Sequence, residues 1–103
     1  MTYRKESMFQ NDVKGLIRKA LPGSYIFKMN GGSGTGNPQG IPDLLILYKS
    51  KWAALECKLN SKAERQPNQE TYVADMNIKA FARFIFPENV EEVIDELEDY
   101  FKF

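Results

Sequence analysis

Hydrophobic and polar residues follow two different periods along this chain. Before Pro22 and again after Pro87, apolar residues recur at the spacing of an amphipathic helix, and Pro67 suits the first turn of a further helix. Elsewhere, short apolar runs are typical of strands. The pattern predicts helices over residues 6–21, 67–77 and 88–101, and strands over residues 24–29, 44–48, 52–59 and 80–86. The order αβββαβα indicates an α/β fold built on a mixed sheet.

The two central strands carry charges where the pattern otherwise indicates burial. Residues 44–48 and 52–59 are apolar at nearly every position, which is typical of strands covered on both faces. Glu56 and Lys58 interrupt the second run, and the alternation of side chains along a strand points both to one face. Asp43 precedes the first run, and the start of one hairpin strand lies beside the end of the next. The three charged groups are therefore expected to converge, whereas Glu56 and Lys58 taken alone indicate a surface ion pair.

Two carboxylates and an ammonium group at one place favour a divalent-metal site. A buried carboxylate costs free energy unless it is paired or bound to a metal. Hard oxygen ligands favour Mg²⁺, with Mn²⁺ as the alternative. The chain has no histidine, which excludes a histidine general base. Cys57 therefore lacks the usual partner of a catalytic thiolate, and we expect it to be a small core residue.

The length, the apolar runs and the cysteine count lead to expectations about domain number and location. The 103 residues, 43% of them apolar, suit a single globular domain over residues 1–103. The first ten residues lack the apolar core of a signal peptide, and no apolar run is long enough to span a membrane. The single cysteine excludes an internal disulfide, so we expect a reducing, cytoplasmic location.

The net charge is zero, but the charges are unevenly distributed along the chain. Residues 1–87 hold 13 Lys and Arg against 7 Asp and Glu, whereas residues 88–103 hold 1 against 7. The body of the chain is thus basic and its C-terminal segment is acidic. A polyanion is attracted to the basic part, although solvated charge is the simpler explanation for both parts.

The charged positions resemble a known nuclease signature. Pro42-Asp43 followed by Glu56-Cys57-Lys58 resembles the PD-(D/E)XK motif, and the predicted order matches the αβββαβ core of that superfamily with a C-terminal helix added. The segments GIPDLL and ALECK, with Gln69 downstream, are more narrowly similar to the virus-type replication–repair nuclease group, VRR-NUC. The small stand-alone members of that group occur in bacteriophages, which places them in the cytoplasm of the host cell.

The resemblance implies a role for each matching residue. Asp43 and Glu56 would bind the metal ion, with the main-chain carbonyl of Cys57 as a third ligand. Lys58 would position or polarise the attacking water. Gln69 would reach the site from the next helix, with Gln66 as the alternative.

Other residues are assigned to the site or to DNA with an alternative left open. Glu6 resembles the acidic residue of the family's first helix, but it also suits the helix dipole. Lys62 and Arg65 would hold phosphates or remain solvated.

Residues 30–40 hold five glycines, and we expect either a flap over DNA or a tolerant surface loop. No Gly-Lys-Ser/Thr follows, which disfavours a nucleotide-binding loop. The two glycines assigned to phosphate are Gly34 and Gly36.

The resemblance implies a metal-dependent DNA endonuclease, selective for four-way junctions or other branched DNA. The alternatives are a nicking, flap or restriction-like nuclease, and a nucleic-acid-binding accessory protein without activity. The complete set of Asp43, Glu56, Lys58 and Gln69 argues against lost activity. A purely structural protein would explain neither the charged residues nor the glycine-rich loop.

We also expect a homodimer, because cutting a junction symmetrically takes two strand breaks and two-fold-related sites supply them. The candidates for a residual apolar surface are Tyr48, Trp52, Tyr100 and Phe103.

Overall fold

The computed structural model describes residues 3–102, and its elements follow the predicted order. The helices are α1 (Glu6–Ala20), α2 (Pro67–Lys79) and α3 (Val90–Phe101). The strands are β1 (Tyr25–Lys28), β2 (Leu44–Tyr48), β3 (Lys51–Cys57) and β4 (Phe81–Ile85). Within residues 3–102, no helix has the length and apolar character needed to cross a membrane.

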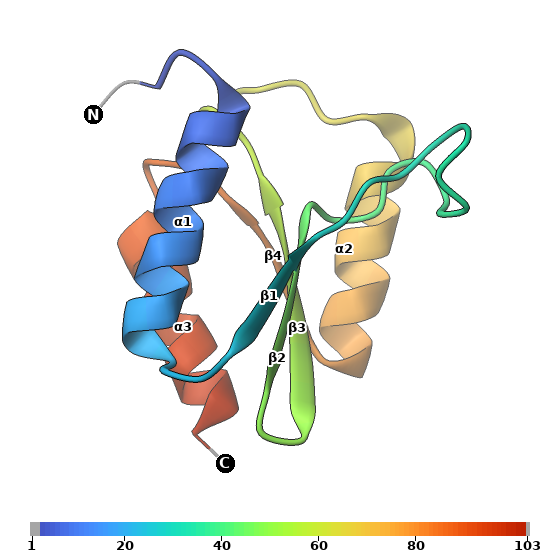
Figure 1. The fold of residues 1–103 in the computed structure, drawn as a ribbon. Coiled ribbons are helices and arrows are strands. Elements are labelled where there is room, and N and C mark those ends of the chain that lie inside the picture. The colour runs from blue at the N-terminus through green and yellow to red at the C-terminus, as the bar shows by residue number, and fades with distance from the viewer. Residues whose placement is uncertain (1–2, 103) are drawn as a thin grey trace.

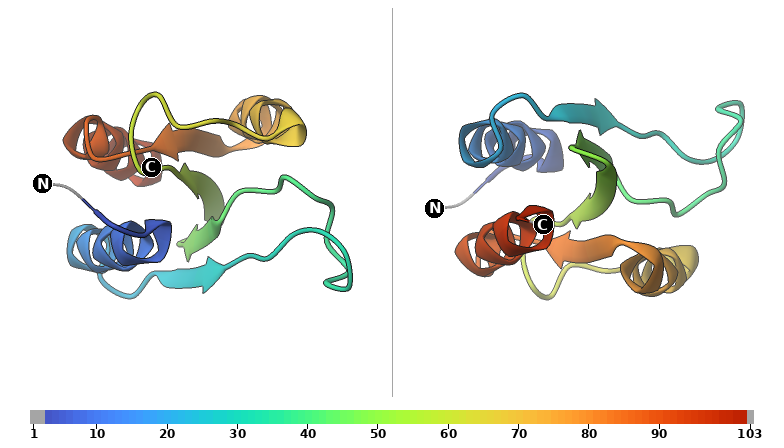
Figure 2. Two further views of the ribbon diagram at one scale, coloured as in Figure 1. Left: turned by 90° about the horizontal axis from the view of Figure 1, so that it is seen from above. Right: turned by 90° about the horizontal axis from the view of Figure 1, so that it is seen from below.

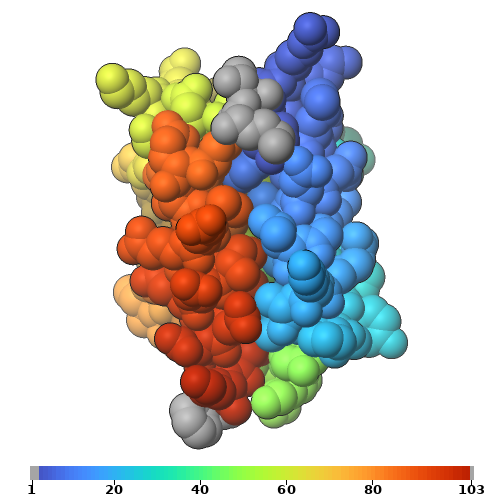
Figure 3. Space-filling view, turned by 90° about the vertical axis from the view of Figure 1, so that its left-hand side faces the viewer, coloured from blue at the N-terminus to red at the C-terminus, as the bar shows by residue number. Residues whose placement is uncertain are grey.

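The four strands form one mixed sheet in the order β1-β2-β3-β4. Strands β1, β2 and β3 pair antiparallel, and β4 adds parallel to β3 after the crossover through α2. Helices α1 and α3 cover one face of the sheet, and α2 lies on the other (Figure 1). Figure 3 shows α1 and α3 side by side over the first face. The result is three layers, helix on sheet on helix.

The main hydrophobic core lies between the sheet and the pair α1 and α3. Phe9, Val13 and Ile17 recur along one stripe of α1, and all three are buried. The acidic helix α3 contributes its own buried stripe, which consists of Val93, Ile94, Leu97 and Phe101. Both stripes pack against buried strand residues, among them Leu44, Ile46, Leu55 and Ile85.

The opposite face of the sheet is only partly covered, by α2. Its buried cluster is small and consists of Ala54, Val73 and Ala82, with Trp52, Met76 and Phe84 packed against it. Strand β3 is buried on both faces, as its apolar run predicts. The same prediction is wrong for β2, where Leu45 is half-buried and Leu47 is 38% exposed. The reason is that α2 lies over β3 and β4, so one face of β2 has no helix above it.

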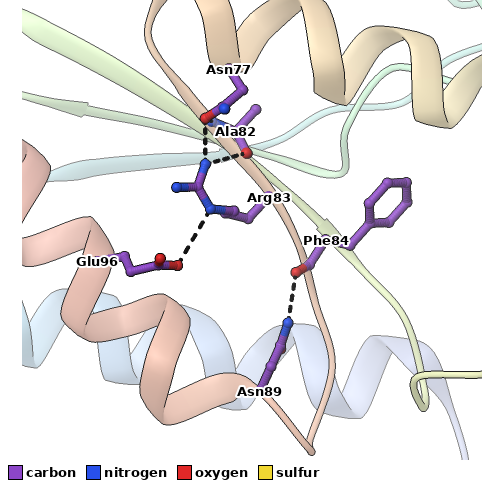
Figure 4. A network of polar contacts seen from close by, with 6 residues as sticks. All are labelled: Asn77, Ala82, Arg83, Phe84, Asn89 and Glu96. Atoms are coloured by element: carbon purple, nitrogen blue, oxygen red, sulfur yellow. Dashed lines mark hydrogen bonds and ion pairs between the residues drawn. The ribbon is translucent and has the colours of Figure 1, made fainter.

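The outer edge of β4 is closed by side chains (Figure 4). Asn77 accepts a hydrogen bond from the amide of Ala82 at 3.2 Å, and Arg83 donates to the carbonyl of Ala82 at 2.9 Å. Asn89 donates to the carbonyl of Phe84 at 3.1 Å and accepts from the amide of Phe86 at 2.9 Å. Arg83 also donates to Asn77 and pairs with Glu96. At the other edge of the sheet, no side chain within residues 3–102 bonds the backbone of β1 in this way.

Replacing Asn89 with alanine should destabilise the fold. The change removes the hydrogen bonds to Phe84 of β4 and to Phe86 just after it, and leaves two part-buried backbone groups without their partner. We expect the free energy of unfolding to fall by about 1–3 kcal/mol. Urea denaturation measures the change. Asn11→Ala, which removes an exposed amide on α1, is the control and should change the free energy by less than about 0.5 kcal/mol. If the two substitutions lower the free energy of unfolding equally, the hydrogen bonds of Asn89 to this edge of the sheet do not stabilise the fold.

Candidate metal centre

Three carboxylates meet at one end of the sheet. The pairing of Leu44 with Leu55 sets Asp43 opposite Glu56 across the hairpin. Glu6, the first residue of α1, approaches the same point, and one carboxylate oxygen of each residue lies within 4.8 Å of the others. The amide of Cys57 donates a hydrogen bond to Asp43 Oδ2 at 3.0 Å, which fixes that carboxylate at the end of β3. We refer to Glu6, Asp43 and Glu56 as the acidic cluster.

Burial makes the acidic cluster electrostatically costly when no cation is bound. Glu56 is 1% exposed, and its Oε1 atom has no hydrogen-bond partner among the described residues. Burial, reinforced by the charge of Asp43, raises the pKa of Glu56 to about 8. Burial likewise raises the pKa of Asp43 and of Glu6. A divalent cation among these oxygens would relieve both the repulsion and the missing partner of Oε1. The donor set therefore fits a hard ion such as Mg²⁺ or Mn²⁺.

Lys58 is fixed beside the acidic cluster. It is 7% exposed, and its Nζ atom lies 3.8 Å from Glu56 Oε2. The same ammonium group donates a hydrogen bond to the main-chain carbonyl of Glu64 at 3.1 Å. This second contact comes from the segment between β3 and α2, which folds back over the end of the sheet. The ammonium group therefore has one fixed position, beside the carboxylates but tied to a separate segment.

Gln69 reaches the acidic cluster from the first turn of α2. Its Nε2 atom donates to Glu56 Oε2 at 3.0 Å, and its Oε1 atom accepts from the amide of Gln66 at 2.9 Å. One side-chain amide thus joins the start of the helix to the carboxylate. The side chain of Gln66 is exposed, so the structure brings Gln69 and not Gln66 to the site.

The thiol of Cys57 lies on the other side of the sheet from Glu56. Cys57 is fully buried in the core beneath α1 and α3, and burial raises the pKa of its thiol. The thiol is therefore a packing group. The backbone of Cys57 does lie at the site, since its amide contacts Asp43. Its carbonyl as a metal ligand stays a prediction.

The residues predicted to bind DNA lie outside the acidic cluster. Lys62 is exposed in the segment before α2. Arg65 is not free, because it pairs with Glu70 at 3.5 Å and its guanidinium group stacks over Phe84 at 3.9 Å. The two loop glycines, Gly34 and Gly36, both have φ near +80° and are exposed, in a loop that extends beyond α2 in Figure 1.

The base of the glycine-rich loop packs against the start of α2. A Cβ atom at Gly40 would lie 2.6 Å from Cβ of Asn68, and Asn68 donates a hydrogen bond to the carbonyl of Gln39. Gly40 also has φ of +94°, a conformation that few other residues adopt. The loop is therefore anchored at this end, while its tip projects into solvent.

Two contributors to the site are missing from the sequence-based prediction. Burial raises the pKa values of Glu6 and Asp43, and the charge of Lys28, at the end of β1, lies near enough to oppose part of that rise. The register of β1 beside Asp43 is the signal that would have found it. The carbonyl of Glu64 is the second, and no sequence signal identifies a main-chain acceptor.

The stability of the metal-free protein should depend on pH through Glu56. Its pKa in the folded state, about 8, exceeds the ordinary value of 4.5, so the folded protein binds more protons than the unfolded chain between these values. The contribution of Glu56 to stability is therefore fully present below about pH 4.5 and is lost as the pH rises to about 8. Glu56→Gln should remove most of this slope and stabilise the protein at pH 8.5 by roughly 3–5 kcal/mol.

Thermal denaturation in EDTA across this pH range measures the effect. Asp75→Asn, which neutralises an exposed carboxylate on α2, is the matched control and should keep the wild-type slope. A Glu56→Gln profile parallel to that of the wild type would show that Glu56 does not titrate in this range.

Comparisons with known proteins bear on the fold. No family model and no curated protein sequence matches the chain. One solved structure, described as "VRR_NUC domain", matches with a TM-score of 0.67 and 19% sequence identity, over 87% of this chain and 94% of the other. The predicted mixed α/β fold is thereby confirmed. The chain therefore shares the fold of the structure described as "VRR_NUC domain".

Proposed function

We propose that this chain is a divalent-metal-dependent DNA endonuclease that hydrolyses phosphodiester bonds. The observation that carries the proposal is the acidic cluster, with oxygens of three carboxylates within 4.8 Å and Lys58 at 3.8 Å from Glu56. A structural ion pair needs one carboxylate, not three. The shared fold with a VRR_NUC domain supports the same activity.

Each residue has a separate task in this proposal. Asp43 and Glu56, with the carbonyl of Cys57, would hold Mg²⁺, or Mn²⁺ as the alternative. The bound ion supplies an acidified water and a Lewis acid for the phosphate. Lys58, held by the carbonyl of Glu64, orients the attacking water and stabilises charge that develops on the phosphate oxygens. Gln69 keeps the carboxylate of Glu56 in its orientation.

We further propose that the substrate is branched DNA, such as a four-way junction, and that the enzyme acts as a homodimer. The uneven charge supports a polyanionic substrate, because residues 1–87 are basic and the acidic helix α3 lies on the face of the sheet opposite α2 (Figure 1). Two strand breaks at one junction need two sites, and each chain offers one acidic cluster among its described residues. A nicking or flap nuclease is the second candidate if the protein is a monomer.

Asp43→Ala and Glu56→Ala should each abolish cleavage while the fold survives, because each removes a proposed metal ligand. Labelled linear, flap and four-way-junction DNAs, incubated with Mg²⁺, Mn²⁺ or EDTA, measure activity and rank the substrates. We expect at least about a 1000-fold loss of rate, corresponding to about 4 kcal/mol in the activation barrier. Asp75→Ala, at an exposed carboxylate of α2, serves as the control and should keep full activity.

Three outcomes would count against the proposal. Cleavage by the wild type in EDTA would exclude the metal requirement. Wild-type rates for Glu56→Ala would exclude the acidic cluster as the active site. Binding of DNA without cleavage under every metal condition would favour the accessory protein.

Lys58→Met should slow cleavage without weakening metal binding. The side chain keeps much of its volume but loses the charge, and the ammonium group is not a metal ligand. A loss of roughly 100- to 1000-fold in the single-turnover rate is expected for a group that stabilises transition-state charge. Mn²⁺ titration, followed by electron paramagnetic resonance, should give an affinity no lower than that of the wild type. Lys79→Met, at an exposed lysine of α2, is the control. An unchanged rate for Lys58→Met would reduce Lys58 to an ion-pair partner.

A further inference from the structure

An uncharged hollow lies on the α2 side of the sheet, next to the acidic cluster. It is bounded by the glycine-rich loop, by β2 and β3 and by α2, and Figure 2 shows the loop and α2 on the same side of the sheet. Its volume is about 170 Å³, and its walls include Met29, Ile41, Leu45, Trp52 and Met76. Among the described residues, no charged side chain lines it, and Asn37 supplies its one side-chain amide.

The hollow begins about one strand repeat from the carboxylates. Ala54, in its wall, precedes Glu56 by two positions on β3, and Leu45 follows Asp43 by two positions at the start of β2. Residues two apart along a strand share a face and lie about 7 Å apart. The sugar of one nucleotide bridges a similar distance between a phosphate and a base. A nucleotide with its phosphate at the acidic cluster can therefore place its base in the hollow.

The wall that the loop contributes is held in place at both ends. A Cβ atom at Gly31 would collide with the carbonyl oxygen of Pro38, so the two arms of the loop touch there. Asn37 Nδ2 donates a hydrogen bond to the carbonyl of Asn30 at 3.0 Å across the same arms. The other end packs against the start of α2 through Gly40. The hollow is therefore formed in the free protein, which lowers the ordering cost of binding.

The size and lining of the hollow suit a single aromatic ring. An apolar cavity of about 150 Å³ holds one benzene ring, whereas larger ligands occupy pockets of about 300–1000 Å³. A phosphate would lack a cation here, but a nucleobase is planar and uncharged. It would stack on the indole of Trp52 and contact the thioethers of Met29 and Met76. Asn37 Oδ1 is an acceptor for an N–H on the edge of the base, since Nδ2 of the same amide is held by the loop.

We propose that the hollow binds one unstacked base of the DNA, from a nucleotide that flanks the phosphate at the acidic cluster. A base inside a duplex is paired and stacked, so it enters only after it is unpaired at a cost in free energy. That cost is least at a branch point, a flap or a single strand, where the base is already unpaired. The hollow would thus select branched DNA through one nucleotide. Its purpose rests on the proposed nuclease function, but base binding itself needs no metal.

Trp52 is one of four residues predicted to leave an apolar surface. Tyr48 packs on Phe101, and the hydroxyl of Tyr100 donates to the carbonyl of Trp52, so these three candidates are half-buried within their own chain. Phe103, the fourth, lies outside the described residues. Trp52 is the only tryptophan of the chain, so tryptophan fluorescence reports on the hollow alone.

Titration with single-stranded oligonucleotides in EDTA tests the hollow without cleavage. The probes are a short oligothymidylate and the same sugar–phosphate chain with every base removed, which carry equal charge. The oligothymidylate should quench the fluorescence of Trp52 and bind at least about tenfold tighter than the abasic chain, because base stacking on the indole is lost with the base. A blunt duplex should not quench the fluorescence, since its bases are paired and stacked.

Leu45→Trp should bring the two affinities together, because the larger side chain fills part of the hollow. Fluorescence anisotropy of labelled oligonucleotides measures the affinities, and circular dichroism checks the fold. Leu47→Trp is the matched control and should keep the wild-type ratio, because Leu47 lies two positions along the same strand, on the same face, and outside the hollow. The two oligonucleotides compared on the wild type need no variant, so that comparison decides the proposal even if Leu45→Trp does not fold.

Equal affinities of the wild type for the two oligonucleotides would overturn the proposal, as would a folded Leu45→Trp protein that keeps the tenfold ratio. Equal affinities, with binding of a hydrophobic dye that Leu45→Trp abolishes, would assign the hollow to an apolar ligand instead. The two proposals fail separately. Base-dependent affinity without metal-dependent cleavage would leave the hollow standing and overturn the nuclease, whereas cleavage with equal affinities would do the reverse.

Discussion

The antiparallel pairing of β2 with β3 is the constraint on which the rest of the site depends. It sets Asp43 opposite Glu56, and the amide of Cys57 then ties Asp43 to the end of β3. A shift of this pairing by one residue would turn every side chain of one strand to the opposite face. The apolar residues on both faces of β3 prevent such a shift, because α1 and α3 pack on one side and α2 packs on the other. The hydrophobic layers thus determine where the carboxylates lie.

The same layers hold together groups that repel one another. Glu56 is surrounded by protein, and its nearest polar contacts come from three different segments: Asp43 before β2, Lys58 after β3 and Gln69 in α2. None of these contacts removes the cost of burying the charge, since the pKa of Glu56 remains raised. The core offsets this cost, which is typical of a functional site that is less stable than an apolar alternative. Rigid surroundings also keep the carboxylate oxygens at distances that suit one small ion.

The sequence allows the fold to be predicted more fully than the site. Helical spacing, strand runs and prolines identify every element, and antiparallel geometry predicts that Asp43 and Glu56 meet. The choice of Gln69 over Gln66 depends on the phase of α2 at its first turn, which periodicity alone cannot fix. The sequence also does not predict that one face of β2 is uncovered, because Leu45 and Leu47 are of a residue type that is usually buried in strands. Whether β2 is covered depends on where the crossover helix α2 packs on the sheet, which is set by tertiary structure.

The two edge strands of the sheet differ in whether side chains bond their outward backbone groups. This difference limits how molecules can associate by strand addition. Side chains of the same chain occupy backbone groups of Ala82, Phe84 and Phe86 along the outer edge at β4, while no side chain within residues 3–102 bonds the backbone of β1. Filaments built by strand addition need two free edges on every molecule, one to accept a neighbour and one to offer itself. A chain with one sealed edge ends such growth at the first partner. Growth of a continuous sheet across many molecules is therefore not open to this fold.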